Sequence, residues 1–156
     1  MTKTQFVNYA NGGFWAYDVA LGVFLKHLID AAEASGQADT TWLSSAVSSW
    51  RTVACFSDYG LTLDANWSAA QRQTFVALAE DACARLAARE SIPAEEIAHW
   101  QLLEDVGIFP RGATEVLTAP VVELGRAIVA LLSGRLPEAP EGKHWLYGTP
   151  TGRETL

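Results

Sequence analysis

Apolar residues recur every three or four positions along most of this 156-residue chain, which is the period of a helix with one buried face. The strongest segment spans 14–34 and follows the turn signal Asn11-Gly12-Gly13. It is apolar on two faces, as expected of a helix at the centre of a bundle or at a subunit contact. The pattern therefore predicts a central first helix, and it raises the hypothesis of a homo-oligomer.

The remaining pattern also predicts helices. Ser68 and Gln71 have the spacing of a capping box, which marks a helix start after Asn66. Pro93 suits the first turn of a shorter helix. We expect further helices over about 40–59, 67–89, 94–106 and 120–133, with a short helical piece over 114–117.

The C-terminal region differs from the rest. Residues 135–142 contain two prolines and a glycine, which is typical of a linker. The segments 144–148 and 152–156 fit either two strands joined by a turn or an extended arm, and the pattern leaves both open. We predict an all-α fold, a single bundle of four to five helices over 1–134, with a linker and irregular arm over 135–156 packed on the same domain.

Charge and cysteine content limit the partners and the compartment. A net charge of −7 repels nucleic-acid phosphates and anionic lipids and attracts a basic protein. No apolar run reaches the ~18 residues of a membrane span. Cys55 and Cys83 make no disulfide framework. We therefore expect a cytoplasmic protein that binds neither nucleic acid nor membrane.

Three motifs suggest chemistry but are incomplete. The segment from Gly148 to Arg153 is one residue short of a phosphate-binding loop, lacks its lysine, and precedes no helix. Glu96 and His99 have di-iron spacing, but a second such motif is missing, so we interpret them as a capping glutamate and a surface histidine. The serines of 44–50 fit close helix packing. We expect no metal, no cofactor and no catalytic residue.

Asp18 is the most informative polar residue, because it lies close to the apolar stripe of the first predicted helix. A carboxylate there must be paired, lie in a groove, or have a raised pKa. Arg51 and Arg126 are the candidate partners, and a buried ion pair is favoured over a ligand site. Should a ligand pocket exist, its candidate residues are Asp18, Trp15, Trp50, Arg51 and Arg126.

Six tryptophans and several acidic clusters favour an aromatic and negative surface over part of the molecule, although a core rich in aromatic residues is the more common arrangement. Such a surface suits a basic protein partner. The candidate partner-contacting residues are Asp58, Asp64, Glu95, Glu96, Glu104, Asp105, Trp145, Tyr147 and Arg153.

Three functional hypotheses follow, in descending order. The first is a non-enzymatic protein-binding module. In size and charge alone the chain resembles the immunity proteins and inhibitors that neutralise basic toxins, and no motif carries this resemblance. The second is a helical bundle that binds a small molecule. The third is an enzyme that uses Asp18 or a histidine as its base.

Overall fold

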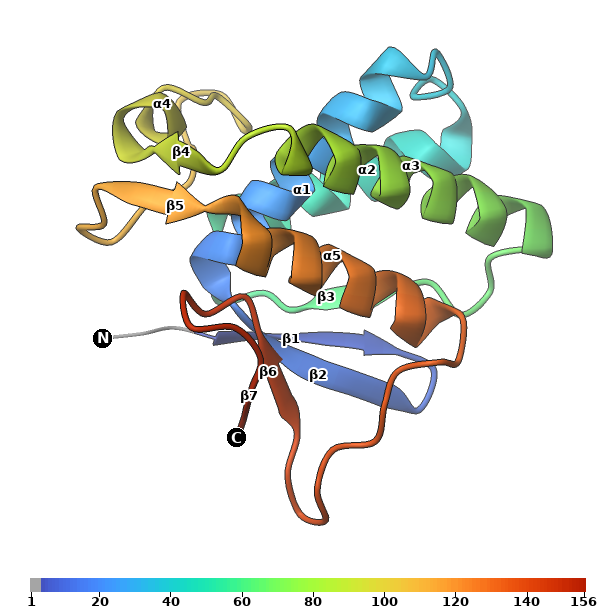
Figure 1. The fold of residues 1–156 in the computed structure, drawn as a ribbon. Coiled ribbons are helices and arrows are strands. Elements are labelled where there is room, and N and C mark those ends of the chain that lie inside the picture. The colour runs from blue at the N-terminus through green and yellow to red at the C-terminus, as the bar shows by residue number, and fades with distance from the viewer. Residues whose placement is uncertain (1–3) are drawn as a thin grey trace.

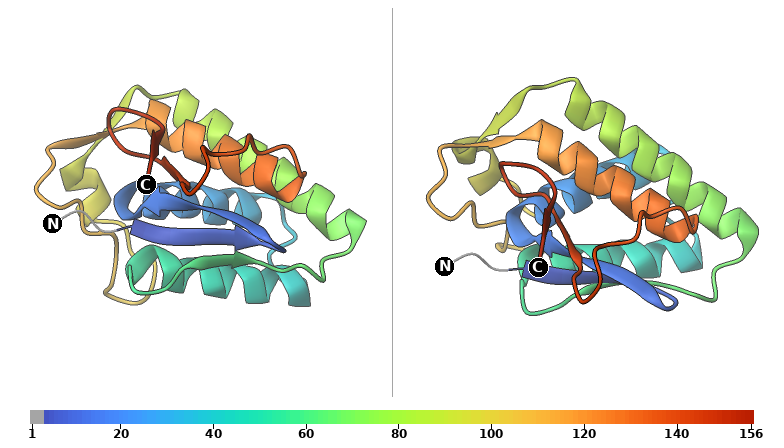
Figure 2. Two further views of the ribbon diagram at one scale, coloured as in Figure 1. Left: turned by 90° about the horizontal axis from the view of Figure 1, so that it is seen from below. Right: turned by 60° about the horizontal axis from the view of Figure 1, so that its bottom comes forward.

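The computed structural model describes residues 4–156. They fold into a five-stranded mixed sheet with helices on one face (Figures 1 and 2). The order of strands in the sheet is β3-β1-β2-β6-β7. A separate two-stranded sheet pairs β4 with β5. The strands are β1 (Thr4–Tyr9), β2 (Gly12–Tyr17), β3 (Leu61–Leu63), β4 (Ser91–Pro93), β5 (Glu115–Leu117), β6 (Trp145–Tyr147) and β7 (Glu154–Thr155). The helices are α1 (Asp18–Ala34), α2 (Thr41–Cys55), α3 (Ala69–Ala87), α4 (Ala94–Ala98) and α5 (Thr118–Leu132).

The prediction of an all-α helical bundle is therefore wrong, and the main error lies at the N-terminus. Residues 4–17 form an antiparallel hairpin in which Val7 pairs with Phe14. The Asn11-Gly12 dipeptide is a strong hairpin signal, and the flanking residues alternate between buried and less buried positions. Phe14 and Tyr17 also fit the helical spacing of the segment that follows. For this reason the two-residue alternation of the second strand was interpreted as the start of a helix.

The predicted helices 40–59, 67–89 and 120–133 correspond to α2, α3 and α5, with shorter or shifted ends. The capping box of α3 is confirmed: Gln71 N donates to Ser68 Oγ at 3.1 Å, and Ser68 N donates to Gln71 Oε1 at 2.8 Å. The first helix begins at Asp18 rather than at residue 14.

Two further predictions are wrong between α3 and α5. The helix expected over 94–106 ends at Ala98, because the chain then turns to bury Leu102 and Ile108. The expected helical piece over 114–117 is strand β5, in which Val116 pairs with Ile92. Both errors reflect long-range contacts overriding local helix preference.

The C-terminal region adds two strands to the sheet. Of the two alternatives, the structure contains the strand pair: β6 runs parallel to β2 and antiparallel to β7. Gly148 follows β6 with a φ of 93°, and a Cβ there would lie 2.6 Å from the Cβ of Ala20. Glycine is therefore required where the chain passes α1.

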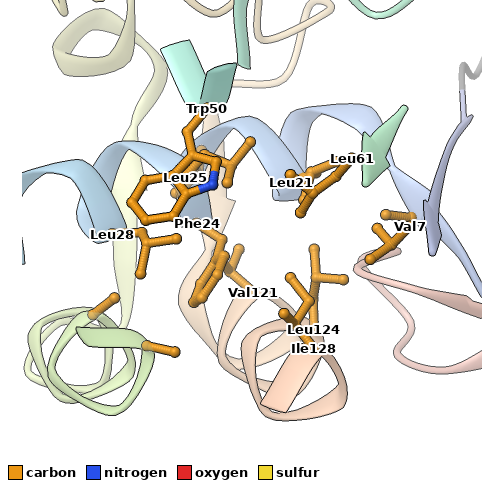
Figure 3. Close-up of a cluster of buried hydrophobic side chains, with 14 of the residues drawn as sticks. Val7, Leu21, Phe24, Leu25, Leu28, Trp50, Leu61, Val121, Leu124 and Ile128 are labelled. Atoms are coloured by element: carbon orange, nitrogen blue, oxygen red, sulfur yellow. The ribbon is translucent and has the colours of Figure 1, made fainter. Parts of the chain in front are cut away.

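Helix α1 occupies the centre of the core (Figure 3). It packs against α2, α3 and α5 and against the sheet, on which α5 also packs, and twelve of its residues are buried. Phe24 and Leu28 pack among α3 and α5, whereas Leu21 faces Val7 and Leu61 of the sheet. Both apolar faces of this helix are thus covered within the chain, so its two-faced pattern reflects a central position.

None of the helices within residues 4–156 combines the length and apolar character that a membrane crossing needs.

Candidate interaction surface

A partly buried ion pair joins the start of α1 to a distant loop. Asp18 lies in the first turn of α1, where a negative charge complements the helix dipole. The Arg111 Nη2 donates to Asp18 Oδ2 at 2.6 Å, and its Nε lies 3.2 and 3.1 Å from Oδ1 and Oδ2. The side chain of Asp18 is 8% exposed and that of Arg111 27% exposed. Its hydrogen bonds to this carboxylate raise the pKa of Arg111.

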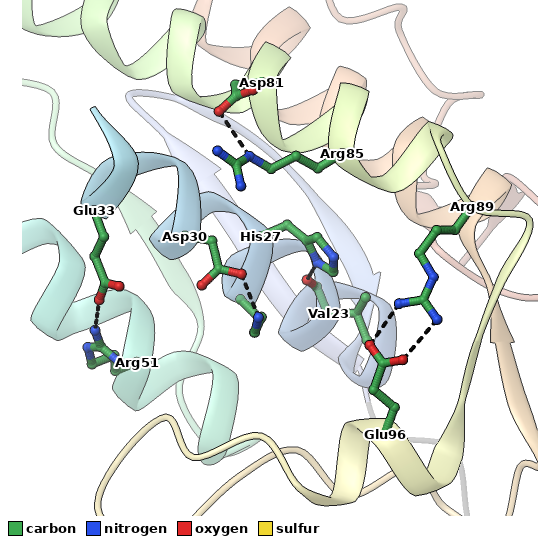
Figure 4. Close-up of polar contacts among 10 residues, drawn as sticks. Val23, His27, Asp30, Glu33, Arg51, Asp81, Arg85, Arg89 and Glu96 are labelled. Carbon is green, nitrogen blue, oxygen red and sulfur yellow. Dashed lines mark hydrogen bonds and ion pairs between the residues drawn. The ribbon is translucent and has the colours of Figure 1, made fainter. Parts of the chain in front are cut away.

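The predicted partners of Asp18 were wrong, and both arginines lie elsewhere. Arg51 pairs with Glu33 at 2.5 Å (Figure 4) and donates to Leu102 O at 3.1 Å. Arg126 lines a groove of about 540 Å³ between α3 and α5. Arg111 escaped notice because it lies 93 residues from Asp18, in a segment whose Pro110 and Gly112 indicate only a loop.

Residues 101–113, which we call the pinned loop, are held at several points by the helical core. Arg51 binds the Leu102 carbonyl, and the Cys55 thiol lies 3.6 Å from Val106 O. Ile108 is buried, and a Cβ on Gly22 of α1 would lie 3.1 Å from its Cγ1. Together with the Arg111 ion pair, these contacts fix the path of the loop on both sides of residue 109.

The pinned loop also carries backbone strain. Glu104 and Arg111 have φ values of 49° and 54°. They are two of the three non-glycine residues with positive φ in the described chain, and the third, Ala10, lies in the turn of the β1–β2 hairpin. Such conformations cost about 1–3 kcal/mol each and persist where surrounding contacts impose them. They concentrate at functional sites, so their presence directs attention to this loop.

Phe109 is 79% exposed between the buried Ile108 and the paired Arg111. Tyr59 and Phe56 are 58% and 43% exposed, and their rings form an edge contact with centroids 6.5 Å apart. Ser57 lines the same small cavity of about 60 Å³ as Phe109, which places the two segments side by side. Acidic residues interleave with these apolar side chains. We define the aromatic–acidic surface as Phe56, Asp58, Tyr59, Glu104, Asp105, Val106 and Phe109.

The turn that carries Phe56 and Tyr59 is itself anchored from the sheet. The amide of Gln5, a buried residue of β1, donates to the carbonyl oxygens of Val53, Phe56 and Tyr59 at 3.1, 3.4 and 2.7 Å. These carbonyls follow or end α2, where the helix cannot satisfy them itself. Both halves of the aromatic–acidic surface are thus held by side chains of the core.

The predicted ligand-pocket residues do not converge. Trp50 is buried against Phe75 in the core. Trp15 lies in edge contact with Phe6, with ring centroids 4.9 Å apart. The small cavity that Asp18 lines has neither tryptophan among its described lining residues, and the Asp18 carboxylate is bound by Arg111.

The acidic candidates outside the aromatic–acidic surface make local contacts. Glu96 binds Arg89 through two hydrogen bonds of 2.7 and 2.8 Å (Figure 4), which lower the pKa of Glu96 and raise that of Arg89. Glu95 O lies 2.6 Å from the His99 Nδ1. Asp64 Oδ1 accepts a hydrogen bond from the backbone amide of residue 66. Across residues 4–156, no three His, Cys, Asp or Glu side chains gather as a metal site.

The C-terminal candidates serve the fold. Tyr147 is buried in edge contact with Phe14, so its assignment to a partner surface does not fit its position. Trp145 is partly buried, its Nε1 donates to Pro137 O at 2.8 Å, and Arg153 lies 3.9 Å over its ring. These contacts tie residues 137–153 together.

Sequence reasoning missed Phe56, Tyr59 and Phe109. The sequence did contain one signal. In Ile108-Phe109-Pro110 an aromatic residue stands beside a loop-forming proline and belongs to no apolar face of a predicted helix.

The described residues also line further hollows. One of about 1160 Å³ lies between the β1–β2 hairpin and residues 131–145 and is wide and chemically mixed. One of about 390 Å³ lies between α3 and the end of α5. One of about 270 Å³ is mostly apolar and lies beside β5 and the first turns of α1 and α5.

Comparison with known proteins adds no further guide, since no protein family, curated sequence or solved structure matches this chain.

Proposed function

We propose that this protein is a non-enzymatic binding module that recognises a basic protein through the aromatic–acidic surface, in the manner of an immunity-type inhibitor. The observation that carries the proposal is Phe109, which is 79% exposed although the residues around it are held in place. An exposed aromatic ring on a fixed backbone loses little conformational freedom on binding and supplies a large apolar contact.

The negative charge of this surface favours a positively charged partner. Asp58, Glu104 and Asp105 lie among the exposed apolar side chains, and the whole chain carries a net charge of −7. Acidic residues around an apolar centre accelerate encounter with a basic surface and disfavour acidic competitors. Free thiols at Cys55 and Cys83 support placing this module in the reducing cytoplasm.

The small-molecule and enzyme hypotheses have weaker support. Asp18 is engaged by Arg111, and its predicted pocket companions lie apart. A general base needs access to substrate, which this paired and largely buried carboxylate lacks.

The test begins with immobilised full-length chain and an extract of the source cells at low salt. Three baits are compared: wild type, Phe109→Ala, and the control Leu156→Ala, which removes an apolar side chain that is also exposed, at 49%. We expect a basic protein that wild type and the control retain and that Phe109→Ala loses.

The retained protein is then purified and its affinity measured by calorimetry. We expect Phe109→Ala to weaken binding about 30-fold, the effect of removing a hot-spot aromatic. Affinity should also fall between low and high salt. The proposal is wrong if no protein distinguishes Phe109→Ala from Leu156→Ala, or if the purified partner binds both variants equally.

A further inference from the structure

An apolar pocket of about 270 Å³ adjoins the small cavity that Phe109 lines, because Val19 lines both and Pro110 of the pocket follows Phe109. Pro110 and Ala113 of the loop form one wall, and Val116 of β5 and Pro120 of α5 form another. The residues that close it are Tyr17, next to Asp18, and Pro150 in the turn after β6. A protein that covers Phe109 therefore lies next to this pocket.

The walls of the pocket are preformed. Pro110, Pro120 and Pro150 have restricted backbones. Glu115 pairs with Pro93 in the two-stranded sheet, and Gly148 passes α1 so closely that any larger residue would clash with Ala20. A pocket whose walls are already fixed binds without the cost of ordering them.

The charge at the pocket is negative. Of its described lining residues, Glu115 is the one that bears a charge. A second carboxylate, that of Glu123, lies beside the 149–152 turn that carries Pro150, its Oε1 3.7 Å from the Cβ position of Gly152. Arg111 follows Pro110, but its guanidinium is engaged by Asp18. Tyr17 adds an aromatic ring, which attracts cations.

The size of the pocket limits its occupant. A cavity of roughly 150 Å³ holds a benzene molecule, and sites for drug-sized ligands span roughly 300–1,000 Å³. A volume of about 270 Å³ therefore has room for one long side chain and is below the range of drug-sized ligands.

We propose that the pocket receives one lysine or arginine side chain of the basic partner. The apolar stem packs against Pro110, Val116 and Pro120, and the charged head lies at Glu115. Basic side chains bury their stems in this way while keeping the head near charge or water. This inference rests on the proposed function, because it names the anchor of the same partner.

The first experiment needs no partner. The full chain is titrated with n-butylamine, which is an ammonium ion at pH 7, and in parallel with 1-butanol, its neutral analogue of similar size. Backbone amide shifts are followed by NMR. We expect saturable butylammonium shifts at Ala20, Val116 and Gly148 with a dissociation constant in the millimolar range, and weaker binding of butanol.

Three variants locate the site. Glu115→Gln should weaken butylammonium about three- to five-fold, the range of a solvent-accessible ion pair, without changing butanol binding. Ala113→Leu fills the pocket and should abolish binding of both probes. Ala119→Leu adds the same bulk at an exposed position of α5 outside the pocket and should bind like wild type. Absence of saturable shifts, or butylammonium binding that Glu115→Gln leaves unchanged, overturns the assignment of a cation pocket.

The second experiment uses the purified partner. Ala113→Leu should weaken its binding at least about ten-fold relative to Ala119→Leu, the loss expected on excluding a buried anchor. Equal affinities for these variants overturn the inference, while the proposed function stands if Phe109→Ala still loses the partner. Butylammonium binding without any partner that distinguishes Phe109→Ala leaves the pocket as a cation site and removes the proposed function.

Discussion

The pinned loop and the linker, residues 135–142, are both irregular connections, yet they are built differently. The pinned loop contains buried Ile108, the Asp18–Arg111 ion pair and two non-glycine residues with positive φ. The linker is mostly exposed, with Leu136 packed against the core and Pro137 O accepting a hydrogen bond from Trp145 Nε1. A connection that only spans a gap needs no strained backbone and no buried charge. The pinned loop has both, and it presents an exposed phenylalanine.

The difference has a stability cost. A buried ion pair is often no more stabilising than apolar residues of the same shape, and positive φ at non-glycine residues is unfavourable. What these features provide is one fixed geometry for Phe109. The comparison thus distinguishes the pinned loop, whose contacts fix the position of an exposed side chain, from the linker, which only connects α5 to β6.

Removing the arginine of the ion pair should have the largest effect. Arg111→Ala leaves the 8% exposed Asp18 carboxylate without this partner, so we expect a loss of about 2–4 kcal/mol in the free energy of unfolding. Urea denaturation measures it. Arg153→Ala, which removes the guanidinium over Trp145 beside the linker, should cost under about 1 kcal/mol. Equal losses would contradict the comparison.

The second-largest loss of stability is expected on removing the Gln5 amide, which anchors the turn that carries Phe56 and Tyr59. Gln5→Leu keeps a buried side chain of similar size but leaves the carbonyls of Val53, Phe56 and Tyr59 without this donor. We expect a loss of about 1–3 kcal/mol. Thermal or urea unfolding tests it, and a variant as stable as wild type would show that solvent replaces the amide.

Insertions test the two connections directly. Two glycines added between Glu138 and Ala139 of the linker should cost under about 1 kcal/mol, since loop-closure entropy grows slowly with length. The same insertion between Glu104 and Asp105 interrupts the contacts of the pinned loop, so it should cost more. Indistinguishable unfolding curves for the two insertions would show that the pinned loop is held no more firmly than the linker.

Much of the helical core follows from the sequence, because α2, α3 and α5 each carry an apolar stripe and α3 a capping box. The sheet does not follow as readily. Its strands are short, and β3 and β6 pair with partners far along the chain. The sequence predicted that Asp18 forms an ion pair but did not predict Arg111 as its partner. Periodicity says nothing about contacts between residues 93 positions apart.

Three residues of the aromatic–acidic surface, Asp58, Glu104 and Asp105, were among the partner-contacting candidates of the sequence, and they are exposed. Their contact with a partner stays a prediction. The exposed apolar residues were not among these candidates, since a helical reading of 94–106 assigns Val106 to a helix end and gives Phe109 no role. Whether an aromatic residue is buried or exposed depends on the path of the chain.

The smallest expected effect concerns His27, which packs against Trp100 just before the pinned loop. Burial lowers the pKa of His27, with Lys26 and Arg89 acting in the same direction and Asp30 and the Val23 carbonyl opposing (Figure 4). The unfolded chain therefore binds this proton more readily than the folded chain. Stability should fall as the pH drops below about 6.5, the unperturbed histidine value.

The variant His27→Leu isolates this contribution. It should lose less stability than wild type between pH 7.5 and pH 5, as measured by urea unfolding at each pH. Parallel curves for the two proteins would show that His27 does not contribute.

The central claim is that the backbone around Phe109 is fixed before any partner binds, and backbone ¹⁵N order parameters measure this most directly. We expect the amides of residues 106–109 and 111 to have values near 0.85, like the helices, and to fall below about 0.6 in Arg111→Ala. Values below about 0.6 in the wild-type chain would contradict the account, because the exposed phenylalanine would then belong to a flexible loop.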